Sequence, residues 1–363
     1  MKRVIVLLLF LGNCLSLTAV AQSGRVTATP EGKSTDQSGQ RPVAPKEISN
    51  PNPPQNLTPK TNAGNADDGD EVLKVDTALV TIPVSVIDRN GHFVTTLRQQ
   101  DFQILENGKS QEIAYFAATE QPITVALLLD VSSSTKFKIG EIHDAATAFI
   151  KQLKPVDKVM IVAFDEKARI LSEPTSDRDQ LSKAIRRAKF HGGTSLYDAV
   201  DFTINRRLSQ IEGRKAIVLF TDGVDTTSRN NTFERTIGAA EEFDATVFSI
   251  HYDTYEADLD DGKPGYGVTR EEYDHGADYI QKLADKTGGK LYEADSTRNL
   301  ETAFFNIAEE LRWQYNLGYY PPETGKTGER KQLKVRVNLQ DVAVRSRESY
   351  IVGKMRNGKS DKR

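Results

Sequence analysis

The sequence predicts an α/β fold: a doubly wound, mainly parallel sheet inserted in a small antiparallel β-sandwich that both chain ends build. Between residues 121 and 312, short apolar runs alternate with segments of helical periodicity, as in parallel sheets covered by helices. On either side, at 72–120 and 313–353, apolar and polar residues alternate with period two, which is typical of antiparallel strands with one buried face. Each flanking segment has too few strands to be stable alone, so we expect one shared sandwich.

Two apolar runs in the middle region are typical of strands buried on both faces, at 123–129 and 216–221. Further strands are expected at 158–164, 168–171, 246–252 and 290–292. Helical spacing of apolar residues predicts helices at 139–153, 179–188, 196–208, 233–243, 279–287 and 300–311. In the flanking segments we expect strands at 79–86, 102–105, 113–116, 315–320, 333–339, 342–344 and 350–352.

The first 21 residues have the pattern of a secretory signal peptide. Lys2 and Arg3 precede an apolar stretch that ends in Ala19-Val20-Ala21, a small-residue cleavage site. Cys14 follows Asn13, where a lipid-attachment signal needs a small residue, so we expect simple cleavage after residue 21, with an uncleaved anchor as the alternative. The protein is therefore predicted to be exported, and to be periplasmic, on the cell surface or secreted.

Cleavage would remove two cations and change the net charge from −3 to −5, and it would also remove the single cysteine. The mature chain is then expected to have neither a disulfide nor a membrane span. Its charges are mixed and no long basic run occurs, so no nucleic acid is expected as a partner.

Residues 22–71 are rich in Pro, Ser, Thr and Asn and contain hardly any aromatic side chain. Such a segment cannot bury enough apolar surface to offset its chain entropy. We expect a disordered tether, which is either a spacer or a segment without function. Residues 354–363 are expected to be a disordered tail.

Five oxygen-bearing side chains follow the predicted strands: Asp130, Ser132 and Ser134 in D-x-S-x-S, Thr194 in G-G-T, and Asp222 in T-D-G. The carboxyl ends of parallel strands meet at one edge of a sheet, where ligands bind near the reversal of strand order. Carboxylates and hydroxyls suit Mg²⁺, Mn²⁺ or Ca²⁺, whereas five His and one Cys offer little to softer metals. The pattern predicts a divalent-cation site, preferably for Mg²⁺. One alternative is that Ser134 or Thr135 merely caps the helix that follows. The other is that the domain keeps the shape of the site but has lost its affinity for metal.

This combination resembles the metal-ion-dependent adhesion site of von Willebrand factor type A (VWFA) domains at all five positions. The stretch from Asp101-Phe102 to Gly108-Lys109 and the L-G-Y-Y-P motif at 317–321 extend the resemblance, over residues 72 to 352, to VWFA-related proteins of the acidobacterial type. The resemblance implies a VWA/Rossmann-like domain at 121–312 with an adhesive, protein-binding role. A partner's Asp or Glu carboxylate would complete the coordination of the cation, because five side-chain donors leave one octahedral position open.

Two other function classes remain as alternatives. A metal-dependent hydrolase is less favoured, because no paired general acid and base can be recognised and His191 has no G-x-S-x-G motif beside it. A metal-independent scaffold of the cell envelope is harder to separate from the leading hypothesis. Gly325-Lys326-Thr327 lacks the earlier glycine of a phosphate loop, and the acidic loop at 258–262 lacks the spacing of an EF-hand.

Overall fold

A computed structural model describes residues 79–118, 121–132, 139–189, 192–252, 268–294, 296–322 and 325–352 of the 363-residue chain. The chain divides into two units, Met1–Asp70 and Glu71–Arg363, and every described residue belongs to the second. The expected signal peptide, tether and tail lie outside the described residues.

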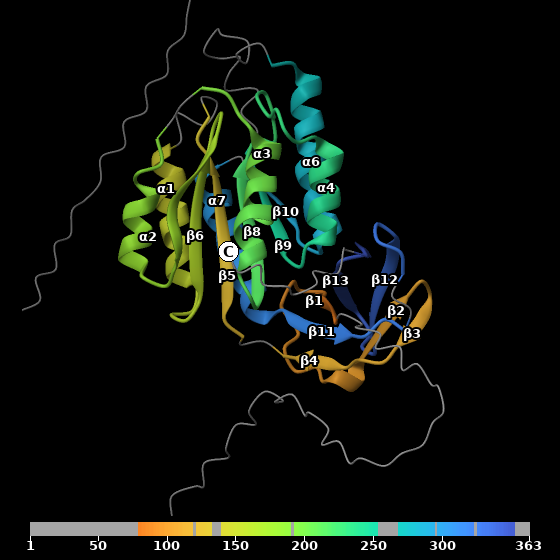
Figure 1. The fold of residues 1–363 in the computed structure, drawn as a ribbon. Coiled ribbons are helices and arrows are strands. Elements are labelled where there is room, and N and C mark those ends of the chain that lie inside the picture. Colours follow the sequence, from red (N-terminus) through yellow and green to blue (C-terminus); the bar gives the residue numbers. More distant parts are fainter. Residues whose placement is uncertain are drawn as a thin grey trace, which may run out of the picture. The chain divides into compact units, whose positions relative to one another are not determined.

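A six-stranded sheet forms the centre of the α/β part, in the order β10-β9-β8-β5-β6-β7 (Figure 1). Its strands are β5 (Ile123–Asp130), β6 (Lys158–Phe164), β7 (Ala168–Thr175), β8 (Arg214–Thr221), β9 (Thr246–His251) and β10 (Leu291–Glu293). All neighbours are parallel except β6 and β7. The predicted doubly wound, mainly parallel sheet is confirmed.

Helices cover both faces of this sheet: α1 (Ile139–Gln152), α2 (Arg178–Ile185), α3 (Leu196–Asp201), α4 (Phe233–Glu242), α6 (Arg270–Thr287) and α7 (Thr297–Trp313). Alternate side chains of β5 explain the two layers. Leu127 and Leu129 pack in a core with α1, α2 and α7, whereas Ala126 and Leu128 pack with α3, α4 and α6. Every residue of β5 is buried, as a strand between two helical layers requires.

Several elements differ from the predicted bounds, and strand β3 (Lys109–Gln111) was not predicted. Three of the differences have a clear physical cause. The expected helix at 196–208 is α3 followed by a π-helical turn, Phe202–Arg207, and a 3-10 turn, Leu208–Gln210; the Thr203 hydroxyl donates to the Ala199 carbonyl at 2.8 Å, a side-chain bond that distorts helices. Helix α6 begins at Arg270, well before residue 279, because Thr269 and Glu272 form a capping box there. Strand β7 continues to Thr175, and its Pro174 is tolerated because β7 is an edge strand.

Both ends of the described chain build a β-sandwich of two four-stranded sheets, β13-β1-β11-β4 and β14-β12-β2-β3. The strands are β1 (Val80–Asp88), β2 (Phe102–Glu106), β3 (Lys109–Gln111), β4 (Tyr115–Ala117), β11 (Tyr315–Tyr319), β12 (Arg330–Val337), β13 (Val342–Ser346) and β14 (Ser349–Ile351); a 3-10 turn, Gln99–Asp101, precedes β2. Early strand β1 lies between late strands β11 and β13, and late strand β12 pairs with early strand β2. One core, which includes Ile82, Ile104, Tyr315 and Val335, joins the two sheets, so the α/β part is an insertion, as predicted.

Two buried glutamates connect the helices to the sandwich. Glu241 of α4 accepts two hydrogen bonds from Arg330, at 2.9 and 2.7 Å, and one from Ser349. Glu310 of α7 accepts from Ser85 of β1 at 2.7 Å and pairs with Arg345 of β13 at 3.2 Å. Burial raises the pKa of Glu310. Because buried charges are tolerated only when paired, these contacts hold the two parts in a defined arrangement.

Candidate metal centre

The predicted ligands Asp130, Ser132 and Asp222 lie at the ends of β5 and β8, the two strands between which the strand order reverses. The chain runs from β5 to β6 on one side and later continues to β8 on the other side. Asp130 is the last residue of β5, and Asp222 directly follows β8. The site therefore lies at the carboxyl edge of the sheet, at a topological switch point.

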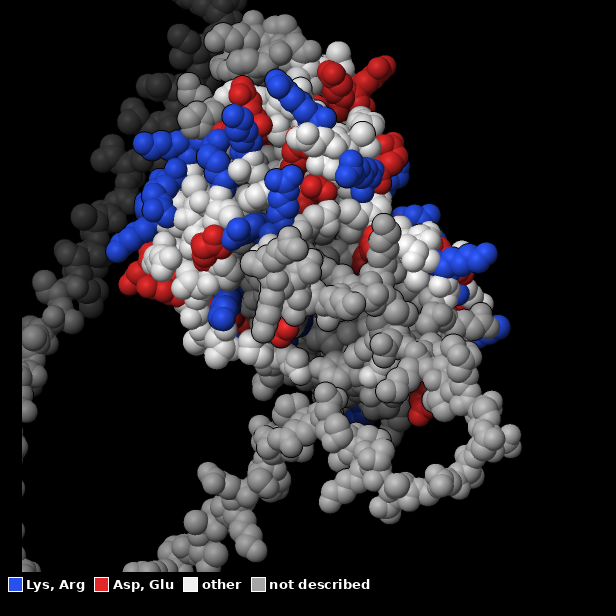
Figure 2. Space-filling view, viewed as in Figure 1, with Lys and Arg blue, Asp and Glu red and all other residues white. Residues whose placement is uncertain are grey.

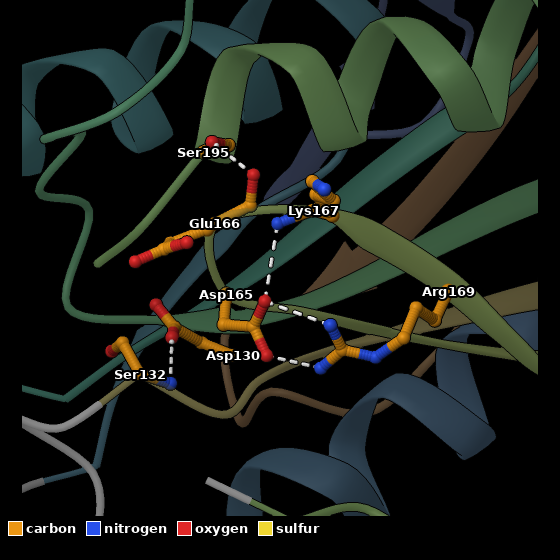
Figure 3. A network of polar contacts seen from close by, with 7 residues as sticks. All are labelled: Asp130, Ser132, Asp165, Glu166, Lys167, Arg169 and Ser195. Atoms are coloured by element: carbon orange, nitrogen blue, oxygen red, sulfur yellow. Dashed lines mark hydrogen bonds and ion pairs between the residues drawn. The ribbon is translucent and has the colours of Figure 1, made fainter. Parts of the chain in front are cut away.

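Hydrogen bonds fix the orientation of the Asp130 carboxylate, which is fully buried. The Thr221 hydroxyl donates to Asp130 Oδ2 at 2.7 Å, and the Ser132 backbone N–H donates to Asp130 Oδ1 at 2.9 Å. Figure 3 shows Ser132 beside this carboxylate. Ser132 is 2% exposed, so the first two side chains of the D-x-S-x-S motif lie together inside the crevice.

Asp222 begins a tight loop that contacts helix α6. Its Oδ1 accepts from the Val224 N–H at 3.0 Å, and the Gly223 N–H donates to the Thr221 hydroxyl at 3.0 Å. Gly223 has φ +84°, and a Cβ there would lie 2.6 Å from the backbone of Gly276. Only glycine fits at this close approach, which places the loop directly against α6.

The Asp130 and Asp222 carboxylates are close enough to interact electrostatically. Burial, and then the charge of Asp222, raise the pKa of Asp130 to about 7. A cation between the two groups would offset both effects. Two carboxylates with serine and threonine hydroxyls also match the oxygen ligands that Mg²⁺, Mn²⁺ and Ca²⁺ prefer. The residues present therefore fit a hard divalent cation.

Within the described part of the chain, no three His, Cys, Asp or Glu side chains are grouped to hold a metal ion. The predicted set contains only two such residues, Asp130 and Asp222, and otherwise consists of hydroxyls. Ser134 lies outside the described residues. A cation held by this set would therefore depend mainly on hydroxyl ligands.

Thr194 lies in a loop that is hydrogen-bonded to the segment after β8 and to the segment after β6. Its backbone N–H donates to the Thr226 hydroxyl at 2.9 Å, and its carbonyl accepts from the Thr226 and Thr227 N–H groups at 2.8 and 2.9 Å. The next N–H, of Ser195, donates to the Asp165 carbonyl at 2.7 Å. The fold thus brings the G-G-T loop to the edge that carries Asp130 and Asp222.

A third aspartate at this edge, Asp165, has a different role. Its carboxylate accepts from Arg169 Nη1 at 2.8 Å and from the Lys167 N–H at 3.1 Å, as Figure 3 shows. Next to it, the exposed Glu166 packs over the Thr194 loop, because a Cβ on Gly193 would lie 2.8 Å from Glu166 Cγ. Asp165 is engaged by an arginine, whereas Glu166 borders the site.

Sequence reasoning missed Thr221 and Thr226, which orient a predicted ligand and the Thr194 loop. The available signal for Thr221 was a hydroxyl at the end of the apolar run 216–220. No comparable signal pointed to Thr226. His251, the last residue of β9, is 8% exposed, and its Nδ1 lies 2.7 Å from Glu293 Oε2. His191 and the acidic loop at 258–262 lie outside the described residues.

Comparison with known proteins agrees with this geometry. Residues 125–224 match the family model of the von Willebrand factor type A domain. This part of the chain is a von Willebrand factor type A domain. The matched residues run from β5 to just beyond β8 and include all five predicted ligand positions. Domains of this family are generally non-enzymatic modules of protein interaction. The narrower resemblance to the acidobacterial type stays a prediction.

Relatives are distant. An uncharacterised protein of Synechocystis is 28% identical over 135 residues, covering 36% of this chain and 32% of that protein. A UPF0353 protein of Mycolicibacterium gilvum is 22% identical over 212 residues, covering 52% of this chain and 61% of the relative. The chain thus spans about a third and about three fifths of the lengths of these two relatives.

Among solved structures, the VWFA domain of the type V pilus tip protein Mfa5 of Porphyromonas gingivalis is 14% identical. It has a TM-score of 0.42, and the match covers 53% of this chain and 95% of that one. A von Willebrand factor type A protein of Catenulispora acidiphila is 12% identical with a TM-score of 0.43, covering 79% and 77%. Similarities at this level carry no inference about function.

None of the helices in the described ranges is long and apolar enough to cross a bilayer.

Proposed function

We propose that this protein binds a divalent cation, Mg²⁺ or else Mn²⁺ or Ca²⁺, through Asp130, Ser132, Ser134, Thr194 and Asp222. The cation then captures an Asp or Glu carboxylate of a protein partner outside the cytoplasm. The single observation that carries this proposal is the buried pair of carboxylates, Asp130 and Asp222, whose proximity and burial raise the pKa of Asp130. Such a pair is costly without a cation.

The chain's own residues prepare the site. Thr221 and the Ser132 N–H hold both oxygens of the Asp130 carboxylate in place, and the Gly223 turn and Thr226 position the other two segments. Preorganised ligands lose little entropy when they bind, which favours affinity. When bound, the cation supplies an electrophilic centre for a carboxylate of the partner.

Export is part of the same proposal. It is supported by the signal-like pattern of residues 1–21 and by the interaction role of the domain family. Fractionation of cells that express the full chain, compared with a chain lacking residues 2–21, tests it. Recovery of the full chain in the cytoplasmic fraction, at its uncleaved mass, would contradict export.

Metal binding is tested by thermal unfolding of the full chain with Mg²⁺, Mn²⁺ or Ca²⁺. A ligand that binds only the folded state stabilises it by about 2.7 kcal/mol at one hundred times its Kd. The gain should disappear in Asp130→Ala and shrink in Thr194→Ala, and it should persist in Asp144→Ala, which removes an exposed acid on α1. An unchanged gain in Asp130→Ala would place the ion elsewhere.

Carboxylate capture is tested with a peptide whose only charged side chain is one Asp, flanked on each side by three Gln, and with its Asn counterpart. With Mg²⁺ present the Asp peptide should bind more tightly, and in chelator the two peptides should bind equally. Equal binding of acid and amide in Mg²⁺ would contradict the mechanism and favour a metal-independent scaffold.

A further inference from the structure

The carboxyl edge of the sheet, which carries the predicted metal ligands and which we call the metal edge, is bordered on one side by a basic surface at the end of α2. We call this surface the α2 patch: Lys183, Arg186, Arg187 and Lys189. We propose that the α2 patch selects partners in which the captured carboxylate is flanked by further acidic residues. This inference rests on the proposed function and adds the chemistry of the partner.

The charge of this segment is opposite to that of the whole chain. Residues 178–189 contain five cations and one acid, Asp179, so their net charge is 5 − 1 = +4, whereas the net charge of the chain is −3. Figure 2 shows Lys and Arg gathered over the part of the surface that α2 occupies at the left of the view. The positive charge is therefore a local feature of this face.

The cations at the end of α2 are available to a partner. Lys183, Arg186, Arg187 and Lys189 are all exposed. Arg187 donates a hydrogen bond to the Leu171 carbonyl. Within the described ranges, none of these four forms an ion pair with an acid, in contrast to Arg169, which is paired with Asp165. Among the described residues, therefore, no acid neutralises these charges by a direct contact.

Packing places the α2 patch next to the predicted metal ligands. Ala188, between Arg187 and Lys189 in sequence, is 3% exposed and packs in one apolar cluster with Val131. Val131 directly follows Asp130. The loop at 192–194, which contains the predicted ligand Thr194, follows α2 in the chain. A ligand bound at Asp130 thus has the end of α2 as its neighbour.

The opposite side of the site has the reverse charge. Asp225, Glu271 and Glu272 line a pocket of about 330 Å³ together with Gly223 and His275. The field at the metal edge is therefore positive toward α2 and negative toward α6. A partner segment with acids on the α2 side gains attraction there, and a uniformly basic segment does not.

The range of the attraction fixes which residues of a partner are affected. At physiological salt the Debye length is about 8 Å, and an extended chain advances about 3.3–3.6 Å per residue. The α2 patch should therefore act on residues within about two or three positions of the captured carboxylate. A helix dipole favours cations in the last turn of α2, but it does not account for Lys189, which lies beyond the helix end at Ile185.

Three seven-residue peptides test the inference with the full chain in saturating Mg²⁺. Each has one central Asp, flanked by three Gln, three Glu or three Lys on both sides. At 50 mM salt we expect the Glu-flanked peptide to bind about tenfold more tightly than the Gln-flanked peptide, and the Lys-flanked peptide to bind most weakly. At 500 mM salt the three affinities should converge.

The variant K183Q/R186Q/K189Q should lose most of the preference for Glu, while its affinity for the Gln-flanked peptide stays the same. The matched control K109Q/K334Q/R336Q removes the same number of exposed charges from the sandwich and should retain the preference. Equal binding of the Glu and Gln peptides to the unmodified protein, or a preference that survives in the α2 variant, overturns the inference.

The same peptides separate this inference from the proposed function. Metal-dependent binding without any preference for Glu flanks overturns only the role of the α2 patch. Binding of the Glu-flanked peptide that is unchanged by chelator and by Asp130→Ala, yet lost in the α2 variant, overturns metal-dependent capture and retains acidic recognition by α2.

Discussion

Thr221 Oγ1 donates a 2.7 Å hydrogen bond to Asp130 Oδ2, although the two residues are 91 positions apart in the chain. This bond joins the carboxyl ends of β5 and β8 inside the sheet. Both residues are fully buried, so the bond is shielded from water and fixes the side chain of Asp130. The geometry of the first predicted ligand therefore depends on a strand that a different part of the sequence supplies.

Replacing Thr221 by Val should weaken both the fold and the metal site. The change leaves Asp130 Oδ2 without this donor and the Gly223 N–H without its acceptor, which costs about 1–3 kcal/mol for a buried group. Urea unfolding should show that loss, and the Mg²⁺-induced gain in Tm should shrink. Thr221→Ser keeps the hydroxyl, so it should retain most of the gain; equal gains in Val and Ser variants would show that the bond does not matter.

Asp130→Asn should separate stability from metal binding. In chelator at pH 8 the variant should be at least as stable as the unmodified protein, because it removes a buried charge beside Asp222. It should also lose the Mg²⁺-induced gain. A variant clearly less stable than the unmodified protein in chelator would contradict the electrostatic account of the site.

The pH dependence in chelator follows from the raised pKa of Asp130. A carboxyl whose pKa rises from an ordinary value of 3.8 to about 7 in the folded state binds its proton more tightly there than in the unfolded chain. Its contribution to stability is fully present below pH 3.8 and is lost as the pH rises through about 7. The stability of the unmodified protein relative to Asp130→Asn should therefore fall between pH 5 and pH 8. A difference that rises over this range has the wrong sign for this account.

The placement of Asp130 and Asp222 at one edge was accessible from the sequence, because two largely apolar runs end just before these residues. Their short length and their β-branched residues favour strands buried on both faces over helices. Thr226 was not accessible, since its contact with Thr194 depends on a loop conformation. The π-helical turn at Phe202–Arg207 was equally hidden, because the apolar residues there keep a spacing that an α-helix also satisfies.

Glu241 was also unpredictable as a buried residue. It stands beside the exposed Glu242 in the same helix, and both are equivalent in charge. Only the sandwich, which supplies Arg330 and Ser349, makes one of them internal. Its burial is thus a consequence of the insertion of the α/β part between two halves of the sandwich.

Glu241→Ala should destabilise the chain by about 1–3 kcal/mol, because it leaves Arg330 and the buried Ser349 hydroxyl without their acceptor. Glu242→Ala is the matched control on the same helix and should change the free energy of unfolding by less than about 0.5 kcal/mol. Denaturant titration of both variants gives the comparison. Similar values for the two would mean that the buried pair contributes little to the junction.

The shared sandwich predicts that the two chain ends depend on each other. Truncation after Trp313 removes β11, which pairs with β1 and β4, and β12, which pairs with β2. Residues 80–117 should then become sensitive to proteolysis. Truncation after Val352 retains every described strand and should preserve resistance; a resistant N-terminal segment in the shorter chain would refute mutual dependence.

The most direct test of the metal site is anomalous diffraction at the manganese absorption edge from crystals of the full chain grown with Mn²⁺. The account predicts one strong peak in contact with the carboxylates of Asp130 or Asp222 and the hydroxyls of Ser132 and Thr194, at metal–oxygen distances of about 2.0–2.2 Å. The peak should be absent in Asp130→Ala. A peak that lies away from these residues, or that persists in Asp130→Ala, would contradict the account.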